Sequence, residues 1–96
     1  MSSPANFKFQ LYVAGDTQNS TLAIANLTAF CRAHLADHHE IEIIDVFREP
    51  KRALANSVFM TPTLVKLMPR PVKKIVGTLS QITTMLQTLG LELAAA

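Results

Sequence analysis

Residues 61–80, TPTLVKLMPRPVKKIVGTLS, decide how the second half of this chain folds. Two short runs in this stretch, residues 63–67 and 72–76, are rich in β-branched and other strand-forming side chains. They lie on either side of the tripeptide Pro-Arg-Pro at residues 69–71. A proline-rich break between two such runs is typical of a hairpin. We therefore predict two strands joined at residues 69–71.

The prolines of this stretch carry a second signal. The bonds before Pro62, Pro69 and Pro71 each have only a small trans preference and isomerise slowly, so the segment is also a candidate conformational switch. A Thr-Pro-Thr that leads into a strand resembles the cis-proline position of thioredoxin-like domains, which lies opposite their active-site loop. The corresponding loop here, residues 15–20, contains no cysteine. The sequence thus predicts a thioredoxin-like scaffold without CxxC and without its redox chemistry.

The residues before this stretch alternate between strand and helix patterns. Apolar side chains occupy every second position of residues 7–13, which predicts a strand with one buried face. Apolar side chains recur at helical spacing in residues 19–35, and residues 40–46 again favour a strand. Residues 49–56 begin with Glu-Pro, and both residue types suit the first turn of a short helix.

After the hairpin, Ser80 is the predicted N-cap of a last helix. Its apolar face is formed by Ile82, Met85, Leu86, Leu89 and Leu93. The predicted order is βαβαββα, an α/β sandwich with helices on both faces of a four-stranded mixed sheet. The chain has 96 residues, enough for one hydrophobic core and not for two, so we expect residues 1–96 to form a single domain.

The amino-acid composition limits the classes of partner and the cellular compartment that we expect. Hydrophobic residues make up 49% of the chain and charged residues 17%, so we expect part of the apolar surface to be covered by another copy or a partner. A net charge of +2, without a long basic block, argues against nucleic-acid binding. No apolar run is long enough for a membrane span, and the N-terminus lacks a signal core. The single Cys31 fits a reducing compartment, and we expect a cytoplasmic protein.

The best candidate functional surface is a group of four cations on the predicted hairpin. Cations mixed with exposed apolar side chains suit an acidic protein partner, because charge aids encounter and orientation. The alternative is an ordinary solvated face. Adjacent residues on a strand also need not face the same way, which applies to the last two members of the group. The candidate partner-binding residues are Lys66, Arg70, Lys73 and Lys74.

Other polar residues carry weaker signals. Cys31 lies mid-helix on the apolar face, with no second cysteine and no adjacent base in the sequence, so we expect a core residue rather than a nucleophile. His34, His38 and His39 could crowd a metal ion, but histidines also suit the C-terminal end of a helix. Asp45 is expected to cap the next helix, and Tyr12 to face outward from its strand, where it could alternatively reach a partner. We expect no catalytic residues, metal or cofactor.

Residues 11–20, 44–46 and 61–80 closely resemble the KaiB family of circadian clock proteins, and the match runs in order over residues 7–91. The resemblance implies a non-enzymatic protein that docks on the hexameric ATPase KaiC, or a relative of it, and modulates its phosphorylation state. It also implies a second, self-associated form, a tetramer or dimer, with the order βαββααβ in place of the thioredoxin-like order. The two forms differ in the C-terminal half. Lys66, Lys73 and Lys74 match the basic hairpin positions of the family.

Some residues depart from the family pattern. Arg70 interrupts the consecutive prolines of the hairpin turn, and Thr88 and Gly90 stand where relatives from cyanobacterial clocks carry Gly and Asp. These departures indicate a divergent or non-clock homologue. The candidate switch residues are Pro62, Pro69, Pro71, Gly77, Thr88 and Gly90.

Two alternative functions remain. The chain could be a thioredoxin-like redox or stress-response protein with Cys31 as its only thiol, but dithiol exchange needs a second cysteine, which the sequence lacks. It could also be a stand-alone homologue of the thioredoxin-like sensor domain of clock output kinases. The basic hairpin favours a KaiB-like protein over that domain.

Overall fold

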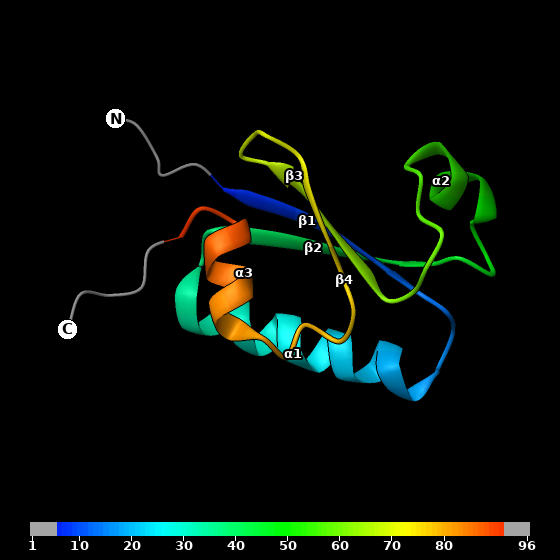
Figure 1. Cartoon of the computed structure of the whole chain (residues 1–96), viewed down its shortest axis with the longest axis horizontal. Helices are drawn as coiled ribbons and strands as arrows, with labels where there is room; N and C mark the ends of the chain where they lie inside the picture. Colours follow the sequence, from blue (N-terminus) through cyan, green and yellow to red (C-terminus); the bar gives the residue numbers. More distant parts are fainter. Residues whose placement is uncertain (1–5, 92–96) are drawn as a thin grey trace.

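The computed structural model describes residues 6–91, and its elements follow the predicted βαβαββα order (Figure 1). The last helix differs most from the prediction. Its N-cap is Gln81 rather than Ser80, and Leu93 lies outside the described residues. The elements are β1 (Phe7–Val13), α1 (Gln18–His34), β2 (His39–Asp45), α2 (Pro50–Ala55), β3 (Thr63–Met68), β4 (Lys73–Val76) and α3 (Ile82–Thr88).

The strands form one four-stranded mixed sheet in the order β2-β1-β3-β4. β1 pairs in parallel with β2 across the α1 connection, and antiparallel with β3, which forms the predicted hairpin with β4. Figure 1 shows α1 and α3 together on one side of the sheet, with α2 set apart from them. The two halves of the chain therefore meet along β1 and β3 at the centre of the sheet.

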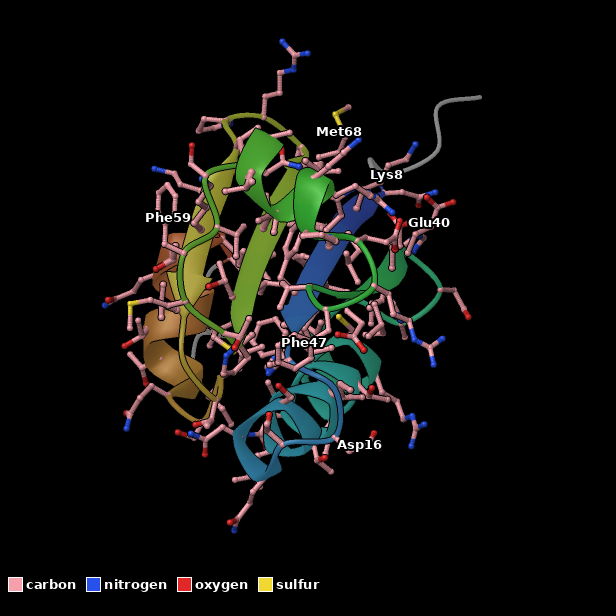
Figure 2. All side chains as sticks on the ribbon, turned by 90° about the vertical axis from the view of Figure 1, so that its right-hand side faces the viewer. Lys8, Asp16, Glu40, Phe47, Phe59 and Met68 are labelled. Atoms are coloured by element: carbon pink, nitrogen blue, oxygen red, sulfur yellow. The ribbon has the colours of Figure 1, made fainter. Side chains whose placement is uncertain are left out.

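The two faces of the sheet are covered unequally. The main core lies under α1 and α3 and includes Leu11, Leu27 and Leu64, all fully buried. The other face is covered by α2, a helix of only six residues. Large apolar side chains stay exposed in the loops before and after this helix, including Phe47 at 74% and Phe59 at 80% of their surface (Figure 2).

The smaller core under α2 is centred on Tyr12. The prediction that Tyr12 faces outward is wrong: its side chain is fully buried together with Ile44 and Val65. Its hydroxyl donates to Gln10 Oε1 at 3.0 Å and accepts from Asn56 Nδ2 at 2.8 Å. Burial is the main cause that raises the pKa of this phenol. The period-two pattern of side chains along β1 is confirmed, but α2 covers the face that the sequence predicts to be exposed to solvent.

None of the helices within residues 6–91 is long and apolar enough to cross a membrane.

Candidate functional site

The loop that corresponds to the active-site loop of thioredoxins is closed by its own hydrogen bonds. Ser20 is fully buried, and its Oγ accepts from the main-chain N–H of Ala14 at 3.1 Å and from Thr17 Oγ1 at 2.8 Å. Asp45 Oδ1 accepts from the N–H groups of Gly15 at 3.3 Å and Phe47 at 2.9 Å. The expectation that Asp45 caps the next helix is wrong, because Glu49 is the N-cap of α2. Through these bonds Asp45 instead joins the loop before α1 to the loop before α2.

Cys31 is fully buried in the main core, as expected. Burial raises the pKa of its thiol to about 12, so the thiol stays protonated near neutral pH. A buried, protonated thiol is a poor nucleophile. This environment argues against the alternative of a redox protein that works through Cys31.

The three histidines do not gather around a common point. The ring of His34 packs against that of Phe30, with centroids 4.7 Å apart, and His39 Nδ1 lies 2.8 Å from the carbonyl oxygen of Leu35. Within residues 6–91, no three His, Cys, Asp or Glu side chains come together as a metal site.

The four predicted cations divide between the two faces of the hairpin. Lys66 is directly opposite Lys73 across the β3–β4 pair, and Lys74 is opposite Val65. Because side chains alternate along a strand, Lys66 and Lys73 share the face of α1 and α3, whereas Lys74 lies on the face of α2. Lys74 Nζ donates to the carbonyl oxygen of Asn56, next to α2. The candidate residues therefore lie in two separate environments, and only the face of α1 and α3 contains more than one cation.

Lys66 and Lys73 open into a cleft between the hairpin and the end of α3, with a volume of about 510 Å³. Arg70 reaches the same cleft from the hairpin turn. Four of the six candidate switch residues also line it. We call it the hairpin cleft; its lining residues are Lys66, Pro69, Arg70, Pro71, Lys73, Gln87, Thr88, Leu89 and Gly90.

The remaining switch candidates lie at the opposite end of the hairpin. The N–H of Gly77 donates to the carbonyl oxygen of Pro62 at 2.9 Å, which closes the base of the β3–β4 pair. Gly77 has a φ of 119°, a conformation that side-chain-bearing residues rarely adopt. The peptide bond before Pro62 is cis, as are those before Pro69 and Pro71.

Lys66 is the most unusual residue of the hairpin cleft. Only 4% of its surface is exposed, although lysine is rarely buried without a partner. Within residues 6–91 no ion pair includes it. Burial first, and then the charge of Lys73, lower the pKa of its ammonium group. The protein thus holds a partly desolvated cation at the wall of the cleft.

Sequence reasoning missed the contacts that fix α2 in place. Arg52 binds Glu42 on β2 through two bonds of 2.7 and 2.9 Å, and also contacts Glu49 at 3.3 Å. Arg52 lowers the pKa of the Glu42 carboxyl through these hydrogen bonds. The residues are ordinary surface types in the sequence, and only the docking of α2 beside β2 brings them together.

Comparisons with known proteins extend the resemblance found in the sequence. The family model of the KaiB domain matches residues 10–91. The chain is 39% identical over 84 residues to circadian clock protein KaiB3 of Synechocystis sp., covering 88% of this chain and 80% of that protein. It is 37% identical over 93 residues to circadian clock oscillator protein KaiB of Prochlorococcus marinus (strain MIT 9313), covering 97% and 76%.

Solved structures with low sequence identity share the fold. The N-terminal domain of Synechococcus elongatus SasA is 19% identical with a TM-score of 0.77, covering 100% of this chain and 94% of that one. Mitochondrial thioredoxin 3 of Saccharomyces cerevisiae, also 19% identical, has a TM-score of 0.71 and coverage of 91% and 80%. These similarities confirm the thioredoxin-like fold predicted from the sequence.

Proposed function

The chain belongs to the KaiB family, and from this premise we propose that it is a non-enzymatic, cytoplasmic regulator that docks on a KaiC-like hexameric ATPase. Docking modulates the phosphorylation state of that ATPase. The observation that carries the proposal is the family match over residues 10–91, in a chain whose only cysteine is buried in the core. A thioredoxin-like protein without an accessible thiol is expected to act by binding a partner through its surface.

The hairpin is the proposed docking surface. Arg70 and Lys73 are exposed on it, and Met68 and Val72, at 43% and 52% exposure, add apolar area beside them. A central apolar contact with surrounding cations suits a partner whose matching surface is acidic. Lys66 lines the cleft beside this surface, on the face of α1 and α3, whereas Lys74 lies on the face of α2.

Charge reversal tests the docking surface. We expect Lys73→Glu to slow association with a purified KaiC-like hexamer by about threefold to tenfold at low salt, with a smaller effect at high salt, because exposed charges steer encounter. Biolayer interferometry gives the association rates. Lys51→Glu on α2 changes the net charge equally and is the matched control. If both variants associate at the same rate as the unmodified chain, the hairpin is only a solvated face.

We also propose that the chain switches to a second, self-associated form, a dimer or tetramer. The support is the exposed apolar surface of α2 and its flanking loops, where Phe47, Leu54, Phe59 and Met60 are each more than half exposed. A rearranged C-terminal half, or a second copy, would bury these side chains. Such a switch requires two packings that differ by only a few kcal/mol.

Amide NMR spectra of the free chain test this switch. We expect two sets of resonances in slow exchange for residues after about position 50, and the second set to gain intensity as protein concentration rises, because self-association follows mass action. Residues of β1 and α1, which belong to the shared half, serve as the internal reference. One set of resonances at every concentration would contradict the switch.

A further inference from the structure

The hairpin cleft places cations against one another without an opposing charge. Lys66 and Lys73 are directly opposite on neighbouring antiparallel strands, an arrangement that destabilises a sheet when the charges are alike. Arg70 lines the same cleft, and none of the described lining residues is acidic. The three cations come from one hairpin and line one cleft. This arrangement favours an anion in the cleft.

Three carbonyl oxygens near the end of α3 are already engaged within the chain. Carbonyl oxygens at a helix end attract cations when they are free. Here the carbonyls of Met85, Leu86 and Gln87 already accept the N–H groups of Leu89, Leu91 and Gly90, at 2.9, 2.8 and 3.2 Å. These three carbonyls are therefore engaged by their own chain, and none of the described lining residues brings a negative charge to Lys66.

We propose that the hairpin cleft is a binding site for a small anion of the phosphate class. A diphosphate or phosphate ester brings two or more negative charges to the three cations, whereas a single carboxylate brings one. The guanidinium of Arg70 matches phosphate oxygens in a bidentate manner, and Lys66 and Lys73 act as point charges. The volume of about 510 Å³ exceeds that of one phosphate group and leaves room for a substituent beside Gln87 and Thr88.

This site goes beyond the proposed docking function, because it requires only the free chain. Inorganic pyrophosphate is the probe, and binding is followed by calorimetry and by amide shifts at constant ionic strength. We expect the amide shifts to concentrate in residues 66–73 and 87–90. Loss of this binding would leave the docking proposal intact, and failure of docking would leave the site intact.

The two adjacent lysines of β4 provide a matched pair of variants. Lys73→Gln is expected to weaken pyrophosphate binding by about tenfold or more, because it removes a charge that faces the cleft. Lys74→Gln removes the same charge from the other face of the same strand and is expected to leave binding within about twofold. Equal weakening by both variants would reveal diffuse attraction and overturn the proposal.

A third variant separates the site from the stability of the fold. Lys66→Met keeps an apolar chain of similar length in the buried position, so the chain is expected to stay folded by circular dichroism while pyrophosphate binding falls at least tenfold. Unchanged binding in this folded variant would overturn the site. ADP compared with pyrophosphate identifies the source: tighter ADP binding supports a nucleotide, and equal binding supports a free phosphate. Acetate that binds as tightly as pyrophosphate would overturn the phosphate class.

Discussion

Replacing Tyr12 by Ala is expected to lower the free energy of unfolding by about 3–5 kcal/mol, the usual loss for truncating a buried aromatic side chain. The effect is large because Tyr12 is the largest side chain of the smaller core, which it forms together with Ile44, Ala53, Val58 and Val65. The hydroxyl also joins β1 to the end of α2 through Asn56. Urea unfolding followed by circular dichroism measures the loss.

Tyr12→Phe is the control for this prediction. It keeps the ring and removes only the hydroxyl, and the expected loss is about 1 kcal/mol, the net value of a typical hydrogen bond. Asn56 Nδ2 keeps its second acceptor, the carbonyl oxygen of Arg52 at 3.1 Å. A loss below about 1 kcal/mol for Tyr12→Ala would mean that the α2 face contributes little to stability and that the main core alone holds the sheet.

The second large effect has the opposite sign. Lys66→Met is expected to raise the free energy of unfolding by up to about 1 kcal/mol, because it removes a partly desolvated charge that faces a like charge. The measurement uses chloride buffer without phosphate, since an anion bound in the cleft would stabilise the unmodified chain. Lys51→Met, at an exposed position on α2, is the control and is expected to change stability by less than about 0.5 kcal/mol.

The advantage of Lys66→Met is expected to depend on pH in one direction. The pKa of Lys66 is lower in the folded chain than its ordinary value of 10.5, so between the two pKa values the unfolded chain binds more protons. The stability of the unmodified chain therefore rises as pH increases through that interval. The difference between the two proteins is greatest near neutral pH and shrinks toward pH 10.5. A difference that grows with pH would contradict the assigned environment of Lys66.

Local patterns predicted most of the fold. The period-two alternation of β1 and the two strand-forming runs around residues 69–71 gave the central strands and the hairpin, because both signals depend on neighbours in the sequence. The errors at Tyr12 and Asp45 share one cause: each residue's role depends on where α2 and its loop dock, which is a long-range contact. The position of Lys66 in a cleft likewise depends on the end of α3, some twenty residues away in the sequence.

The sequence predicted which residues form the candidate surface but not how they are arranged in space. The sequence placed four cations on one hairpin, and alternation left open whether Lys73 and Lys74 face the same way. Which of the two faces would contain a cleft required the positions of α1 and α3. The participation of Thr88 and Gly90 in the wall of that cleft was not predicted, because these residues were selected only by their departure from related sequences.

The sheet order also has a consequence for solubility. β4 is an edge strand, and an unpaired edge is a template on which further chains can add as intermolecular strands. β4 has only four residues, and its two adjacent lysines project to opposite faces of the sheet. An incoming copy of β4 would meet positive charge on both faces at once. The same charges that make the hairpin a candidate recognition surface therefore also disfavour the addition of intermolecular strands at this edge.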